Sequence, residues 1–175
     1  MATAPPLPQI PLALVTNVFQ AWGGQEKSVM QNIYDYERFH KRFPALTSIT
    51  VYEVLVGFEN TIAKRGGTDE RTERGRDEAL RLIQLSGMLP SGPSPSGILP
   101  FDETAATIAA FVAGRLFKQV AKRKTGPSFL RDIFQAAAAL AHRHGVATRN
   151  EKDFELIGEH LPATHPLLHL ALWKR

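Results

Sequence analysis

The chain has 175 residues, of which 43% are hydrophobic and 22% charged, a balance typical of one folded globular domain. It contains no cysteine, which excludes disulfides, thiolate zinc sites, iron–sulfur clusters and cysteine nucleophiles. A net charge of +4 permits polyanionic partners such as nucleic acids. Because no apolar run approaches the roughly 20 residues of a membrane-spanning helix, we expect a cytoplasmic protein without a membrane partner.

Short apolar segments alternate with amphipathic ones along the chain. Residues 1–9 are rich in proline and predict a flexible tail, which leaves residues 10–175 as a single domain. In the first half of the chain we predict a strand at 11–15, a turn or cap at 16–17, a helix at 25–41, a strand at 46–50 and helices at 50–65 and 68–85. In the second half we predict a loop at 86–97, a strand at 97–101, helices at 102–122 and 129–142, a strand at 146–148, a turn capped by Asn150 and an edge strand at 166–173. Strands that alternate with helices indicate an α/β domain with a parallel sheet.

Three acidic residues stand just beyond predicted strands or in the first turn of a predicted helix. They are Glu53, Asp132 and Asp153. In open α/β sheets, ligands bind outside the carboxyl ends of the strands, so we expect the three carboxylates to converge there. An oxygen-rich site of this kind suits a hard divalent cation such as Mg2+. Such a cation can activate a water and offset charge on a phosphoryl group.

Each of these acids also has a purely structural interpretation. Glu53 follows Thr50 by three residues, and Asp153 follows Asn150 by three, which is the spacing of a helix capping box. Asp132 lies near the start of its predicted helix, where a carboxylate suits the helix dipole. An unrelated α/β domain whose acids only cap helices is therefore a further hypothesis.

A basic cluster begins in the second half of the predicted helix at 102–122 and ends in the next predicted helix. Its members are Arg115, Lys118, Lys122, Arg123, Lys124 and Arg131, and no acidic residue lies between the first and the last of them. Such a cluster is typical of a solvated helix end, because cations are favoured at helix C-termini. The alternative is a surface on which Lys118, Lys122, Arg123, Lys124 and Arg131 contact the phosphates of RNA.

Four segments carry a resemblance to a known family. They are LALVTNVFQAW, SITVYEVLVGF around Glu53, ILPFDETAATIAA, and GPSFLRDIFQAAAALAHRHGVATRNEKDF with its TRNxxDF turn. In this order they resemble segments of the PIN-domain nucleases, particularly the VapC-type toxins of type II toxin–antitoxin pairs. The resemblance runs from Leu12 to Phe154 and so covers most of the chain.

The resemblance implies a three-layer α/β/α PIN-like domain with a central parallel sheet and an acidic pocket that holds Mg2+ or Mn2+. Carried over by position, the catalytic and metal-binding residues are Glu53, Asp132 and Asp153, and Thr16 and Asn150 shape the pocket. The implied activity is endonucleolytic cleavage of RNA. The implied partners are an RNA substrate, a VapB-like antitoxin and a second copy of the chain in a homodimer.

Val15 departs from this pattern, because the family has an aspartate where Val15 stands in the pocket. Valine has no side-chain oxygen and cannot ligate a metal. The sequence leaves three interpretations open: a degenerate member, a substitution that silences a toxic enzyme, or weak activity with three acids. The alternative function is accordingly a catalytically silent PIN-fold protein that binds RNA or an antitoxin-like partner.

Overall fold

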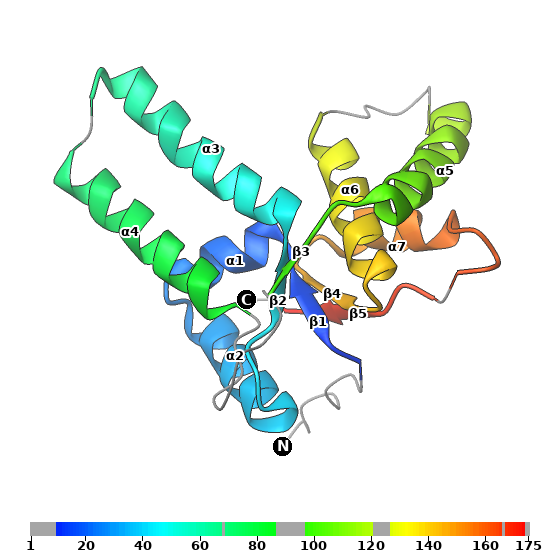
Figure 1. The fold of residues 1–175 in the computed structure, drawn as a ribbon, viewed down its shortest axis with the longest axis horizontal. Helices are drawn as coiled ribbons and strands as arrows, with labels where there is room; N and C mark the ends of the chain where they lie inside the picture. The colour runs from blue at the N-terminus through cyan, green and yellow to red at the C-terminus, as the bar shows by residue number, and fades with distance from the viewer. Residues whose placement is uncertain (1–9, 68, 87–96, 121–126, 166, 174–175) are drawn as a thin grey trace.

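A parallel β-sheet of five strands lies at the centre of the computed structural model, which describes residues 10–67, 69–86, 97–120, 127–165 and 167–173, with the backbone alone for 117–120 (Figure 1). The strands are β1 Leu12–Leu14, β2 Ala45–Thr47, β3 Ile98–Leu99, β4 Gly145–Thr148 and β5 Leu170–Leu172. Their order is β3-β2-β1-β4-β5, so β1 lies in the middle and β5 at one edge. In the register, Leu14 is paired with Leu46 on one side and Ala147 on the other.

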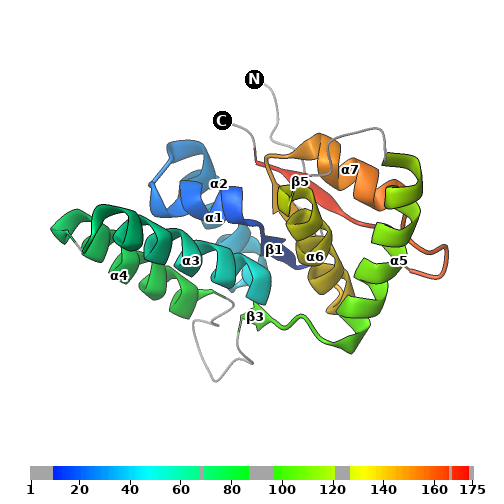
Figure 2. The same cartoon turned by 90° about the horizontal axis from the view of Figure 1, so that it is seen from above.

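Helices cover both faces of the sheet (Figure 2). The helices of one layer are α1 Thr16–Gly23, α2 Lys27–His40, α3 Ser48–Arg65 and α4 Glu70–Leu85. The helices of the other layer are α5 Glu103–Val120, α6 Pro127–Ala141 and α7 Glu151–Glu159. The predicted three-layer α/β/α architecture with a parallel central sheet is therefore confirmed.

Strands β1, β2 and β4 are buried along their whole length, whereas β5 at the edge of the sheet is only partly buried. All three residues of β1 are fully buried, and the backbone N–H of Leu12 donates to the hydroxyl of the equally buried Tyr36 at 3.0 Å. Gly145 starts β4 where no side chain fits, since a Cβ there would lie 2.8 Å from the carbonyl oxygen of His169. In the part of the chain that the structure describes, no helix is long and apolar enough to cross a membrane.

Two of the predicted boundaries are wrong at the carboxyl ends of β1 and β2. Thr16 and Asn17 begin helix α1 instead of forming a turn, although Val15 at the N-cap has no side chain that could cap it. Helix α3 begins at Ser48, because Thr47 rather than Thr50 is its N-cap and accepts a hydrogen bond from Thr50 N at 3.1 Å. Thr50 lies inside the helix and donates from its hydroxyl to Leu14 O at 3.1 Å, which fixes α3 against β1.

Candidate functional site

Polar side chains from four elements meet at the carboxyl edge of the sheet. Thr16 begins α1 directly after β1, and Glu53 lies in the second turn of α3, which follows β2. Asp132 lies in the second turn of α6, and Asp153 lies in the first turn of α7, just after β4. Parallel strands present their carboxyl ends at one edge of the sheet, and this topology brings the elements that carry the acids to the same edge.

Glu53 is surrounded by hydrogen-bond donors. Its Oε1 forms an ion pair with Arg131 Nε at 2.5 Å, and its Oε2 accepts from Gln135 Nε2 at 2.5 Å and from the Thr16 hydroxyl. Gln135 Nε2 also donates to Thr16 Oγ1 at 2.9 Å, which closes a ring of contacts between α1, α3 and α6. The Glu53 side chain is only 14% exposed. Its negative charge is therefore balanced within the protein.

Among the described residues, Asp132 and Asp153 share one side-chain amide donor. Asn150 Nδ2 lies 3.1 Å from Asp132 Oδ2 and 2.7 Å from Asp153 Oδ2. Burial raises the pKa of Asp132 to about 7, with further contributions from the carboxylates of Asp153 and Glu53, while Asn150 and Arg131 oppose the rise. This pair therefore carries negative charge that the chain compensates incompletely.

The capping interpretation of the acids does not fit this geometry. Glu53 cannot pair with Thr50 in a capping box, because the helix starts before Thr50. Asn150 occupies the N-cap position of α7 but makes no capping bond with its side chain, which contacts the two aspartates instead. The helix dipole acts most strongly in the first turn of a helix, and Asp132 lies beyond the first turn of α6.

The donor set fits a cation only in part. Mg2+ is commonly held by one or two carboxylates and several waters, which Asp132 and Asp153 can supply. The oxygens of Glu53 are already occupied by three donors. Among the residues that the structure describes, no group of three or more His, Asp or Glu side chains is arranged to hold a metal ion. The three-carboxylate ligand set stays a prediction.

Val15 belongs to the core instead of the polar site. It is 2% exposed, packs within the hydrophobic cluster and donates from its backbone N–H to Ala147 O at 3.2 Å. The next residue, Thr16, carries the hydroxyl that reaches Glu53. At this end of β1 the chain therefore contributes a hydroxyl and a buried apolar side chain.

Two residues of the site were missed in the sequence. Gln135 is 1% exposed, and its Oε1 has no hydrogen-bond partner among the described residues. A polar residue within the apolar run of α6, three positions after Asp132, was the available signal. Arg149 was also missed: it forms an ion pair with Glu26 at 2.5 Å and donates from Nε to Trp173 O at 3.3 Å, which anchors the turn before Asn150.

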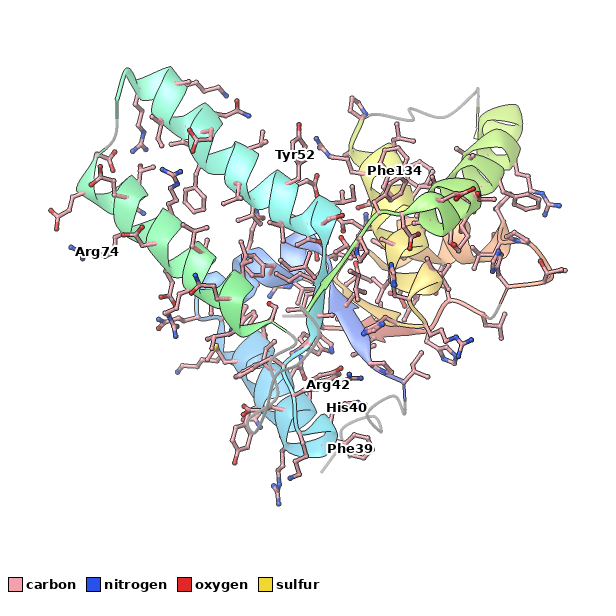
Figure 3. All side chains as sticks on the ribbon, viewed as in Figure 1. Phe39, His40, Arg42, Tyr52, Arg74 and Phe134 are labelled. Atoms are coloured by element: carbon pink, nitrogen blue, oxygen red, sulfur yellow. The ribbon has the colours of Figure 1, made fainter. Side chains whose placement is uncertain are left out.

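Of the predicted RNA contacts, only Arg131 can be placed. The side chain of Lys118 and all of Lys122, Arg123 and Lys124 lie outside the described residues. Figure 3 shows Tyr52 on α3 and Phe134 on α6, the two helices joined by the Glu53–Arg131 ion pair. Tyr52 is 61% exposed.

No protein-family model matches the sequence, and no curated protein matches it. Solved structures do match. The chain is similar to VapBC2 from Rickettsia felis bound to a promoter DNA fragment, with a TM-score of 0.66 and 17% identity over 94% of this chain and 100% of the other. It is similar to DNA-bound VapBC from Salmonella typhimurium, with a TM-score of 0.62 and 18% identity over 94% and 99%.

A third similar structure is VapBC-5 from Mycobacterium tuberculosis, a member of the VapBC family of toxin–antitoxin systems. The TM-score is 0.52, with 19% identity over 95% of this chain and 99% of the other. The class defined by the fold is thus a three-layer α/β/α PIN-like protein. Within it, the resemblance to VapC-type toxins is confirmed at the level of the fold.

Proposed function

We propose that the chain is a metal-dependent endoribonuclease, the toxin component of a toxin–antitoxin pair, with activity weakened by Val15. The observation that carries this proposal is the pair Asp132 and Asp153, which share one donor at the carboxyl edge of the sheet. The fold supports it, because the similar structures are VapBC complexes.

Asp132 and Asp153 are the residues that would hold Mg2+ or Mn2+. When bound there, a divalent cation activates water for attack and offsets negative charge on the phosphate. Asn150 holds the two carboxyl groups toward one another. The raised pKa of Asp132 supports this assignment, because a cation would relieve the repulsion that contributes to it.

The partners proposed for the chain follow from the same class. RNA is the proposed substrate, and a VapB-like antitoxin is the proposed protein partner, since the similar structures are VapBC assemblies. A homodimer is proposed from the family resemblance.

A second candidate function is a catalytically silent PIN-fold protein that binds RNA or an antitoxin-like partner. Two observations favour it. Val15 supplies no ligand, and Glu53 is neutralised by Arg131. In this case the acidic edge would bind a partner without cleaving RNA.

Cleavage of a labelled RNA in the presence of Mg2+, Mn2+ or a chelator tests the proposal. We expect divalent-dependent cleavage that Asp153→Asn abolishes. The matched control is Glu155→Gln, an exposed acid two residues away on the same helix, which should cleave like the unaltered chain. RNA binding without cleavage supports the silent protein, and equal cleavage in chelator contradicts metal dependence.

A further inference from the structure

We infer that Glu53 positions Arg131 to contact a backbone phosphate of RNA, and is not itself a metal ligand. The inference rests on the proposed function for its substrate class. It changes the role of Glu53 from a group that holds a cation for catalysis to a group that holds a side chain for binding.

The first step is that Glu53 is fixed in place. Glu53 Oε2 accepts hydrogen bonds from Gln135 and Thr16, and Glu53 Oε1 forms an ion pair with Arg131. Gln135 is almost completely buried and contacts both Glu53 and Thr16, so two of these donors come from the packed interior. A cation could bind Glu53 Oε2 only by displacing the donors from α1 and α6, and Oε1 only by displacing Arg131.

The second step is that Arg131 is only partly used. Its Nε bonds to Glu53, and among the described residues its terminal NH2 groups have no other hydrogen bond or ion pair in the structure. The Arg131 side chain is 46% exposed, in contrast to 14% for Glu53. The planar guanidinium therefore presents its outer N–H groups to solvent, in the fork geometry that matches a phosphate.

The third step concerns location. Arg131 directly precedes Asp132 on α6 and pairs with Glu53 at the same edge of the sheet, where Asn150 contacts both Asp132 and Asp153. A phosphate bound by Arg131 would thus lie beside the Asp132–Asp153 pair. Holding the guanidinium in advance also reduces the side-chain entropy lost on binding.

The proposed role of Glu53 predicts the direction in which its removal changes RNA affinity. A carboxylate close to bound RNA repels the phosphates, so its removal should tighten binding if it does nothing else. Removal of Glu53 should instead weaken binding, because Arg131 loses the partner that orients it. Glu155→Gln removes the same charge from an exposed position on α7, two residues after Asp153, and is the matched control.

The test measures binding of a short fluorescein-labelled single-stranded uridine oligonucleotide in EDTA, by fluorescence anisotropy over a range of salt. Arg131→Gln should weaken binding about tenfold and flatten the log–log salt dependence by about 0.7, the value for one phosphate contact on a single strand. Glu53→Gln should weaken binding about threefold, and Glu155→Gln should leave it unchanged or tighten it. The double variant of Arg131 and Glu53 should bind no more weakly than Arg131→Gln alone.

Glu53→Asp provides a second variant that retains the charge but withdraws the carboxylate by one methylene. It should also weaken binding, whereas charge alone predicts no change. Tighter binding by Glu53→Gln, an unaltered salt dependence in Arg131→Gln, or no RNA binding by the unaltered chain would overturn the inference. Cleavage with Mn2+ is scored separately: its absence alongside the expected binding pattern removes the nuclease proposal only.

Discussion

The carboxylates at the carboxyl edge of the sheet form two groups, Glu53 and the pair Asp132 and Asp153, which differ in how far the protein compensates their negative charge. Glu53 receives an arginine, an amide and a hydroxyl, and its charge is balanced inside the fold. Asp132 and Asp153 receive one amide between them. The difference teaches that closeness of carboxylates does not by itself make a metal site, because donors supplied by the protein compete for the same oxygens.

The comparison also separates two kinds of electrostatic behaviour. A carboxylate paired with a guanidinium stabilises the fold while it is ionised. A carboxylate that faces another carboxylate in a partly buried site destabilises the fold when it is ionised, and its pKa rises. Substitutions in the two groups should therefore change stability in opposite directions.

The largest expected effect comes from adding an acid at the end of β1. Val15→Asp places a carboxylate at a position that is 2% exposed and should lower the free energy of unfolding in chelator by at least about 3 kcal/mol. Mn2+ should recover much of that loss, since a ligand that binds the native state stabilises it, and should raise RNA cleavage. Thermal melting and cleavage assays with Mn2+ and with chelator measure both.

Val15→Asn is the matched control, with the same shape and no charge. It should be destabilised without any recovery on addition of Mn2+. An equal response of the two variants to Mn2+ would show that the end of β1 is not next to a cation site.

The next effect should have the opposite sign. Asp132→Asn should stabilise the protein in EDTA by on the order of 2 kcal/mol at about pH 8. The pKa shift of Asp132 from 3.8 to about 7 represents roughly 4 kcal/mol, and we take half of that value because the side chain keeps some contact with water. Below about pH 4 the carboxyl is protonated in both the folded and the unfolded chain, so the gain should vanish. Urea unfolding at several pH values measures it, and a gain independent of pH contradicts the assigned cause.

Glu53→Gln should destabilise the protein by about 1.5 kcal/mol, because it removes a charge-assisted bond to Arg131. Glu59→Gln on the same helix is the control: its ion pair with Arg76 is exposed, and its loss should cost less than about 0.5 kcal/mol. A double-mutant cycle with Arg131→Gln measures the coupling. Equal losses of stability in Glu53→Gln and Glu59→Gln would mean that the Glu53–Arg131 ion pair contributes no more than an exposed ion pair.

The smallest effect concerns the shared donor. Asn150→Ala should cost about 1 kcal/mol at about pH 8, because the two aspartates then face each other without an amide between them. The loss should be smaller at about pH 5, where Asp132 is protonated in the folded chain. Equal losses at both pH values would point to a role in the turn before α7 instead.

Much of this architecture was predictable from local patterns. The apolar runs that became β1, β2, β3 and β4 lie close to their predicted positions, and Gly66 ends α3 in a left-handed conformation as the glycine pair indicates. Helix α1 was missed because its N-cap is Val15, which gives no capping signal. The start of α3 was misplaced because Thr47 and Thr50 are both plausible caps, and only packing against β1 selects Thr47.

The sequence by itself determined most of the strands and helices and singled out the three acids, since apolar periodicity and capping residues act over a few neighbours. It also places Arg131 and Gln135 one helical turn apart on α6. Only the tertiary structure decided that both meet Glu53, which is 82 residues from Gln135, and that Gln135 meets Thr16, 119 residues away. Such contacts form only when the parallel strands align their carboxyl ends, so the compensation of each carboxylate is a property of the assembled sheet.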